Sequence, residues 1–413
     1  MMLSPAALER RFVLLTALRW LPVGLLIPIS VLYALDRGLG IAELGLAASI
    51  QGIVVLILEL PSGGLADSWG RRPVLIAASS VSLIAVVTLS FAQSFPAFVA
   101  VYALQGVFRA LDSGALEAWF ADAAIAAGGR ATVDKGLAAA GAAIGIGIGG
   151  GAILSSGITL IAPALGVDPL QLPIWMSAAL TAGYLGVVIA FVHEDRIARA
   201  STTLATALRG VPRMLGDGIR LLRSSRILRA LIGVELFWGF GMYAFESLTP
   251  VKLADVVGDA DAAAAMLGPV TAAGWLLFSG GSALMRALSG RFNVALMAAL
   301  FRVLQGATVV ALGLVAGPTG VIVAFIACYA AHGASNPLHN TLLHAQVTGQ
   351  NRATVLSMNS MIAFPAGSLG AIVLGGIAGG VSLTTAFIVA GIVLALAAPL
   401  YLPAWRAGRV VTD

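Results

Sequence analysis

The amino-acid sequence predicts an all-α membrane protein with twelve transmembrane helices. Of its 413 residues, 59% are hydrophobic and only 10% are charged, whereas roughly a quarter of the residues of a soluble domain are charged. The mean hydropathy is +0.97. Apolar stretches close to the roughly 20 residues that span a bilayer recur along the whole chain. This composition argues against a soluble enzyme.

Polar or Gly/Pro-rich breaks divide the chain into twelve expected spans, of which the first is an uncleaved helix. The spans are 12–34, 41–66, 72–93, 96–122, 135–157, 172–192, 227–250, 263–285, 293–316, 319–345, 352–378 and 383–404. The longest break, 193–226, predicts an N-terminal bundle of six helices over 1–192 and a C-terminal bundle over 227–413. This arginine-rich linker is either an amphipathic helix on the inner leaflet or a solvated connection that sets topology.

The basic residues predict the orientation, because Lys and Arg collect on the cytoplasmic side of a membrane. Of the 24 basic residues, only Arg37 and Lys252 fall in outer loops, and Arg19, Arg109 and Arg302 fall inside spans. The others lie on one side, so both termini are expected in the cytoplasm. Arginine far outnumbers lysine, which is typical of a bacterial genome of high GC content. We therefore expect a multi-pass protein of the bacterial cytoplasmic (inner) membrane.

Several function classes are not supported by the sequence. The net charge of +5 follows from the cytoplasmic bias of the basic residues, so no nucleic-acid partner is expected. The single cysteine, Cys328, excludes an internal disulfide and a thiolate metal cluster. No HExxH, GxSxG or cofactor-binding loop occurs, so a membrane-embedded enzyme is a remote alternative and no cofactor is expected. No segment is typical of a channel filter.

One segment between the second and third spans carries a specific motif, GGLADSWGRRPVL. It resembles the signature loop of the major facilitator superfamily, Gly-x-Leu-Ala-Asp-x-x-Gly-Arg-Arg/Lys-x-x-Leu. The fixed positions are met by Gly63, Leu65, Ala66, Asp67, Gly70, Arg71, Arg72 and Leu75. We expect Gly63 to permit close helix approach and Gly70 to permit a tight turn, while Asp67 pairs with Arg71.

The resemblance implies two pseudo-symmetric six-helix bundles that alternate access to a central site for a small molecule, in a monomer. It also implies that the loop latches the cytoplasmic gate together with an acid of the fourth span, either Asp122 or Glu117. A degenerate copy in the second half, Gly290-Arg291, has Ala287 in place of the acid. A charged latch is therefore expected only in the first half.

Span five resembles an antiporter pattern, Gly-x-x-x-Gly-Pro-x-x-Gly-Gly, although Ile146 replaces the proline. The matching residues are Gly141, Gly145, Gly149 and Gly150. A glycine-rich helix-packing face accounts for the same residues. The chain is most similar to the drug:proton antiporter branch, which implies proton-coupled efflux of a small amphipathic compound or drug. The alternative is uptake of a small nutrient or metabolite by a proton symporter or uniporter.

Ionisable residues inside spans are functional candidates, because charge at membrane depth costs at least about 2.5 kcal/mol per group. Arg109 and Asp112 lie three residues apart, on one face of span four, and are expected to neutralise each other beside an aqueous cavity or as a static ion pair. Arg19 is expected to extend back to the inner interface. The proton-coupling candidates among these residues are Asp112 with Arg109, Glu59 and Glu235.

Span ten places His332, Asn336 and His339 on one stripe. Histidine titrates near neutral pH, which makes His332 a proton-coupling candidate, whereas Asn336 and His339 are expected in the substrate cavity. No further ligand stands at a metal-binding spacing, so no metal is expected. Three aromatic residues of span seven form either a substrate contact or an interfacial belt, and they are Trp238, Tyr243 and Phe245. Glu246 beside them is expected at the rim of the substrate entrance.

Overall fold

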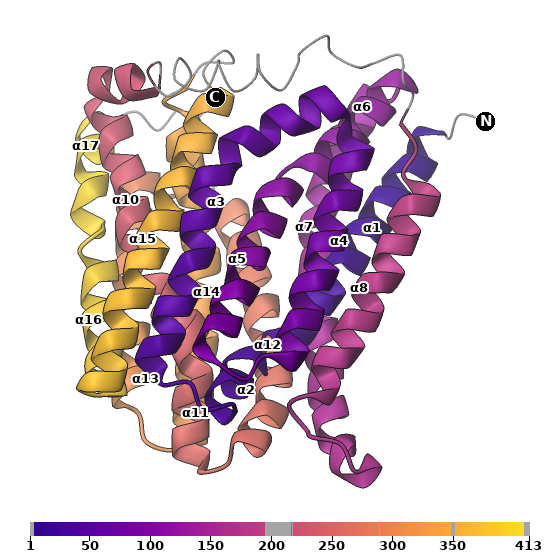
Figure 1. Cartoon of the computed structure of the whole chain (residues 1–413). Helices are drawn as coiled ribbons and strands as arrows, with labels where there is room; N and C mark the ends of the chain where they lie inside the picture. Colours follow the sequence, from indigo (N-terminus) through magenta and orange to yellow (C-terminus); the bar gives the residue numbers. More distant parts are fainter. Residues whose placement is uncertain (1–3, 195–215, 217, 289, 348–351, 409–413) are drawn as a thin grey trace. The chain divides into compact units, whose positions relative to one another are not determined.

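The computed structural model describes residues 4–194, 216, 218–288, 290–347 and 352–408, and in these ranges every regular element is a helix (Figure 1). The elements before the linker are α1 (Pro5–Leu26), α2 (Ser30–Asp36), α3 (Ile41–Trp69), α4 (Arg71–Phe91), α5 (Phe95–Asp112), α6 (Ala115–Ala126), α7 (Arg130–Ile161), η1 (Ala162–Leu165) and α8 (Leu172–Phe191). Those after it are α10 (Arg226–Tyr243), η3 (Ala244–Leu248), α11 (Thr249–Val257), α12 (Ala260–Ala287), α13 (Val294–Leu314), α14 (Pro318–His344), α15 (Arg352–Gly380), α16 (Leu383–Ala395), η4 (Ala398–Tyr401) and α17 (Leu402–Arg406).

Eleven helical segments of the described chain are long and apolar enough to cross a membrane. The consecutive helices α5 and α6 supply a twelfth crossing, which contains charged residues and is interrupted. Six crossings precede the linker and six follow it. The predicted fold class, an all-α membrane protein with twelve spans, is therefore confirmed.

The expectation of one continuous helix over 96–122 was wrong. The helix ends at Asp112 and a new one begins at Ala115, because Gly114 adopts a left-handed conformation with φ of 70°. A residue without Cβ takes this conformation readily. The interruption ends α5 within the fourth crossing, and this end contributes to the site described below.

Span seven is also irregular and extends further than the expected 227–250. Its middle, Ala244–Leu248, is a π-helical turn between α10 and α11, which ends at Val257. Single π-helical turns inside α-helices occur frequently at functional sites. The turn carries Phe245 and Glu246, two of the residues expected to contact substrate.

The described chain forms two compact units. The first comprises Met1–Gly38, Val54–Val211 and Ala264–Ala272, and the second Leu39–Ile53, Pro212–Ala263 and Ala273–Asp413. The bundle boundaries expected from the sequence, 1–192 and 227–413, stay a prediction. Most of the 193–226 linker, residues 195–215 and 217, lies outside the described residues, so its two interpretations also stay open.

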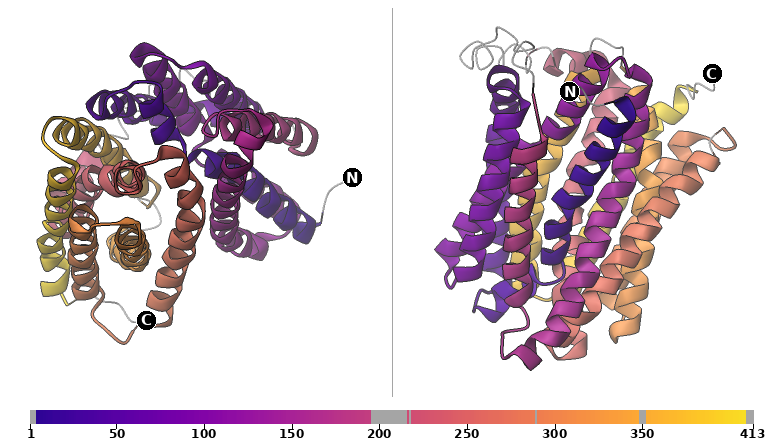
Figure 2. Two further views of the ribbon diagram at one scale, coloured as in Figure 1. Left: turned by 90° about the horizontal axis from the view of Figure 1, so that it is seen from below. Right: turned by 90° about the vertical axis from the view of Figure 1, so that its right-hand side faces the viewer.

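In the first unit, α1 packs along α7, and the two helices lie side by side in Figure 2. A Cβ on Gly147 would lie 2.7 Å from the Ala17 carbonyl oxygen, and Gly24 and Gly151 leave equally little room. Small residues allow this close backbone approach. At one end of the unit, Phe12 of α1 stacks on Phe120 of α6, with ring centroids 4.3 Å apart.

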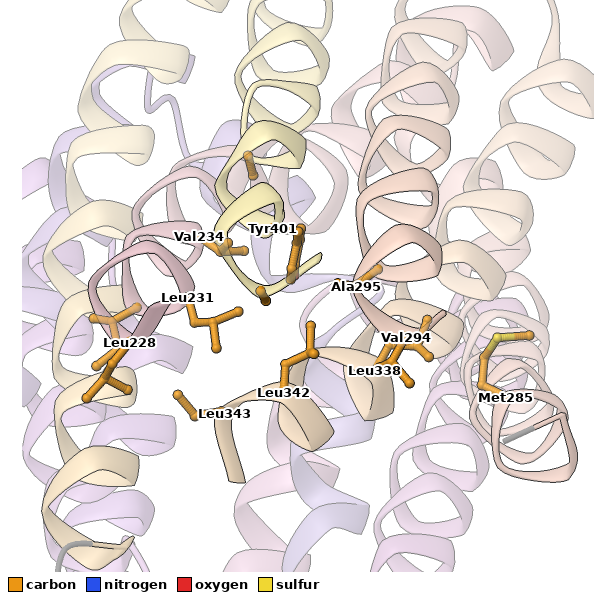
Figure 3. Close-up of a cluster of buried hydrophobic side chains, with 14 of the residues drawn as sticks. Leu228, Leu231, Val234, Met285, Val294, Ala295, Leu338, Leu342, Leu343 and Tyr401 are labelled. Atoms are coloured by element: carbon orange, nitrogen blue, oxygen red, sulfur yellow. The ribbon is translucent and has the colours of Figure 1, made fainter. Parts of the chain in front are cut away.

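In the second unit, a buried apolar cluster joins α10, α13, α14 and η4 (Figure 3). Leu231 and Val234 of α10 lie beside Tyr401, and Leu338 and Leu342 of α14 approach from another side. These side chains are removed from solvent, and their packing fixes the polar groups that lie among them.

Candidate functional site

The first unit contains a buried ion pair between Arg19 of α1 and Asp112 of α5. The Asp112 side chain is 2% exposed and that of Arg19 is 14% exposed. The expectation that Arg19 extends to the inner interface was wrong, because the acid on α5 holds its guanidinium inside the unit. The structure thus gives Asp112 a partner on a different helix from the expected Arg109.

A second acid lies next to the interruption between α5 and α6. Glu59 of α3 is half-buried, and its Oε1 accepts a hydrogen bond of 2.9 Å from the Ser113 hydroxyl. Arg109 interacts electrostatically with Glu59 and has an exposed side chain. Exposed charge at membrane depth is tolerated where it faces water. The structure therefore gathers three sequence candidates, Glu59, Arg109 and Asp112, with Arg19 at one place.

The signature loop is hydrogen-bonded to Glu194, a residue that the sequence did not identify as functional. Gly70 has φ of 98°, so it makes the expected tight turn, and α4 begins directly after it. The Glu194 carboxylate accepts hydrogen bonds from the backbone N–H groups of Arg71, at 2.9 Å, and Arg72, at 3.2 Å. A carboxylate at a helix N-terminus satisfies free N–H groups and interacts favourably with the helix dipole.

Of the two acids expected to join the latch, the structure brings Asp122 to Arg71, with Oδ2 3.8 Å from Nε. Glu117 instead belongs to the electrostatic surroundings of Arg19. The side chain of Asp67 lies outside the described part of the chain. Its expected pairing with Arg71 therefore stays a prediction.

One glycine prediction needs correction. A Cβ on Gly63 would meet no described atom within 4 Å, so this residue does not serve close helix approach. In α7, Gly141 is equally open, and Cβ atoms on Gly149 and Gly150 would make only ordinary contacts. The tightest packing of α7 against α1 uses Gly147 and Gly151, and the two interpretations of the antiporter-like pattern stay predictions.

The second unit contains a closed circuit of aromatic rings. His332 contacts Phe278 at 5.2 Å between ring centroids and Phe245 at 6.0 Å. Trp275 and Tyr329 complete the circuit, and Trp238 stacks on His332 at 5.5 Å. The ring nitrogens Trp238 Nε1, Trp275 Nε1 and His332 Nδ1 are buried without a hydrogen-bond partner in the described chain. Flat rings and spare polar groups suit a ring-containing ligand.

The remaining substrate candidates are divided between different places. Glu246 lies beside the aromatic circuit, where its Oε1 accepts a hydrogen bond of 2.7 Å from the Tyr329 hydroxyl. Tyr243 is buried. Asn336 is half-buried and its Oδ1 accepts a hydrogen bond from Asn340.

His339 does not join the aromatic circuit and belongs to a separate buried polar network. Its Nε2 lies 3.2 Å from Oε1 of Glu235, and its Nδ1 lies 3.0 Å from the Tyr401 hydroxyl. Arg302 of α13 lies near Tyr401 and donates to the Gln305 side chain at 2.9 Å. The network thus combines Glu235, a predicted proton-coupling residue, and His339, a predicted substrate-cavity residue, with Arg302 and Tyr401, whose roles the sequence did not indicate.

The residues that the structure describes contain no group of three or more His, Cys, Asp or Glu side chains that could hold a metal ion. The candidate sites are instead of two kinds. Ion pairs and hydrogen-bonded side chains can bind and release protons, and the aromatic circuit can hold an organic molecule.

Comparisons with known proteins agree with this arrangement. Residues 12–335 match the model of the Major Facilitator Superfamily. An uncharacterized MFS-type transporter of Bacillus subtilis (strain 168), YxaM, is 28% identical over 104 residues, which are 25% of this chain and 26% of that protein. The chain thus spans about a quarter of the length of the curated relative it matches.

Solved structures of transporters are similar to the whole chain. The nucleoside transporter NupG has a TM-score of 0.77 at 15% identity, over 97% of this chain and 99% of that chain. A bacterial homolog of the human lysosomal transporter Spinster, inward-facing and unoccupied, also has a TM-score of 0.77, at 14% identity over 97% of each chain. These likenesses show the fold. Since the family match covers well over half of the sequence, the chain belongs to the Major Facilitator Superfamily.

Proposed function

We propose that the protein is a proton-coupled secondary transporter that exports a small, amphipathic, ring-containing compound by alternating access. It works in the bacterial inner membrane as a monomer, with both termini in the cytoplasm. The observation that supports this proposal most is the buried ion pair of Arg19 and Asp112, which joins two helices at the interruption of the fourth crossing.

The ion pair suits proton coupling because its two charges lie on different helices. Removing one partner of a buried pair costs about 3–5 kcal/mol, since the other charge is left uncompensated. A movement of α1 relative to α5 therefore favours protonation of the freed Asp112 carboxylate. Return of Arg19 displaces the proton, so one proton is released for each cycle of separation and closure.

The aromatic circuit supplies the proposed substrate site. Trp238, Phe245 and His332 offer flat surfaces, and the indole N–H groups of Trp238 and Trp275 can donate to a bound molecule. The carboxylate of Glu246 lies beside them, held by Tyr329. Such a site binds rings with polar substituents, as an amphipathic compound has.

The signature loop is proposed to hold the cytoplasmic gate. Arg71 approaches Asp122, and its backbone N–H is bonded to Glu194 at the end of α8. A latch made of exposed charges is weak, on the order of 1 kcal/mol or less per pair. It can therefore open in each transport cycle.

Transport of ethidium into liposomes that contain the purified protein tests the proposal. With the membrane potential clamped, a gradient that is acidic inside should drive ethidium accumulation, and a protonophore should abolish it. Accumulation driven by the opposite gradient would support the symport alternative. Downhill movement that ignores the gradient would support a uniporter and contradict proton coupling.

A further inference from the structure

A chain of four polar side chains crosses the second unit, one from each of four elements. Glu235 belongs to α10, Arg302 to α13, His339 to α14 and Tyr401 to η4. They are 6%, 2%, 3% and 1% exposed. Tyr401 lies in the apolar cluster of Leu231, Val234, Leu338 and Leu342 (Figure 3). The polar chain is therefore enclosed by packed hydrocarbon.

The donor and acceptor properties of these groups indicate the tautomer of His339. Its Nε2 lies 3.2 Å from Oε1 of Glu235, although no hydrogen bond of good geometry joins the two atoms. A proton on Nε2 is attracted by this carboxylate, whereas a lone pair there would be repelled by it. A neutral imidazole protonated at Nε2 accepts at Nδ1, so the Tyr401 hydroxyl donates to Nδ1 over 3.0 Å. The guanidinium of Arg302, which only donates, adds a positive charge near the Tyr401 hydroxyl.

The other polar groups around the chain add no charge. Asn359 of α15 lies near Glu235 and His339, and the Gln305 side chain accepts a hydrogen bond from Arg302. The helix α16, which packs against α10 and α13, contains no ionisable residue. The other described charged groups on α10, α14 and α17 are exposed near helix ends, and they are Arg226, Arg229, His344 and Arg406. His332 of α14 belongs to the aromatic circuit, and Glu246 of η3 to its edge.

One added proton changes the chain in a defined way. Before it binds, the charges of Arg302 and Glu235 balance, and after it binds the net charge is +1. With a proton on both ring nitrogens, Nδ1 of His339 becomes a donor, so the Tyr401 hydroxyl can no longer donate to it. The hydrogen bond that connects α14 to η4 is reversed. The excess charge also favours a state in which water reaches the chain, because apolar surroundings disfavour unpaired charge.

We propose that the pair of Glu235 and His339 is a second proton-binding site, whose occupancy reverses the hydrogen bond between α14 and η4. The proton is shared by the pair, since strongly interacting groups titrate together. The contribution of this site to transport rests on the proposed function, whereas its binding of a proton does not. A network that merely stabilises the fold would keep one protonation state throughout.

Nitrogen-15 NMR of histidine-labelled protein in lipid nanodiscs tests the site directly. The chain has four histidines, and the His339→Gln variant identifies the signals of His339. At high pH we expect an unprotonated Nδ1 and a protonated Nε2, and on acidification a reversible change to an imidazolium. The exposed His344 provides an internal reference signal. A neutral His339 at every pH at which the protein stays folded would overturn the proposal, as would a proton on Nδ1 at high pH.

Two variants distinguish this site from the pair on Asp112. Glu235→Gln removes the counter-charge beside Arg302, so the imidazolium signal of His339 should disappear. Asp112→Asn should leave the His339 titration unchanged, even where it abolishes proton-driven transport. If Glu235→Gln does not fold, the titration of the parent protein still decides the question. Loss of the His339 titration in Asp112→Asn would contradict an independent second site.

Discussion

Two glycines of the signature loop differ in what an added side chain would meet. Gly70 has a positive φ, and a Cβ there would lie 2.5 Å from Glu194 Oε2, whereas Gly63 is helical and open. We expect Gly70→Ala to destabilise the protein by about 1–2 kcal/mol through backbone strain and to displace the Glu194 carboxylate. Gly63→Ala should be neutral or slightly stabilising. Melting temperatures of both variants in detergent provide the measurement, and equal effects would contradict the assigned roles.

Arg19 and Arg109 provide a second comparison between single residues. Arg19→Gln leaves the Asp112 carboxylate buried without its partner, so a loss of about 3–5 kcal/mol is expected. Adding Asp112→Asn should restore much of it, because no buried charge then remains uncompensated. Arg109→Gln alters an exposed side chain and should cost less. Thermal unfolding of the single and double variants measures these losses of stability. A larger loss in Arg109→Gln than in Arg19→Gln would show that Arg19 is not the main partner of Asp112.

The sequence predicts which residues carry the site better than it predicts their partners. Asp112, Glu59 and Glu235 are identifiable because charge inside an apolar span is costly. The partner of Asp112 lies on another helix far away in the chain, and no spacing rule reaches it. Tyr401 had no signal at all, because an aromatic residue near the end of an apolar helix is ordinary. Glu194 stands at the edge of the linker and looks like a solvated charge.

At the scale of elements, the interruption between α5 and α6 controls where Asp112 and Asp122 lie. The twelve spans were predictable because apolar length dominates helix placement in a bilayer. This break was not, because glycine is common inside membrane helices and only its φ of 70° reveals the turn. The π-helical turn at Ala244–Leu248 was not predictable either, because its sequence contains no glycine or proline that marks an irregularity.

Gly114→Ala tests the interruption as an element. A Cβ at this position would meet nothing within 4 Å, so the cost is backbone strain alone, about 1–2 kcal/mol. The rate of ethidium transport should fall even though the protein still folds, because the turn positions Asp112. Gly157→Ala in α7, which is equally open, is the matched control and should retain transport. Full activity of a stable Gly114→Ala variant would contradict the proposed role of the turn.

At the scale of the whole molecule, the charge distribution predicts the orientation in the membrane. The N-terminus, Arg71, Arg209 and Asp413 are expected in the cytoplasm, and Arg37 and Lys252 outside. In a background without Cys328, Asp36→Cys should react with a membrane-impermeant thiol reagent on intact cells. Ala126→Cys, also exposed, should react only after lysis. The reverse pattern would invert the topology and the direction of every proposed step.

Separating coupled transport from exchange shows whether Asp112 couples protons to transport. Purified Asp112→Asn in liposomes should lose accumulation of ethidium driven by an imposed proton gradient. It should retain exchange of labelled for unlabelled ethidium across the membrane, because binding and alternating access do not need the proton. Asp134→Asn, which alters an exposed carboxylate near the start of α7, serves as the matched control and should retain both activities. Gradient-driven accumulation by a folded Asp112→Asn protein at the parent rate would contradict the account.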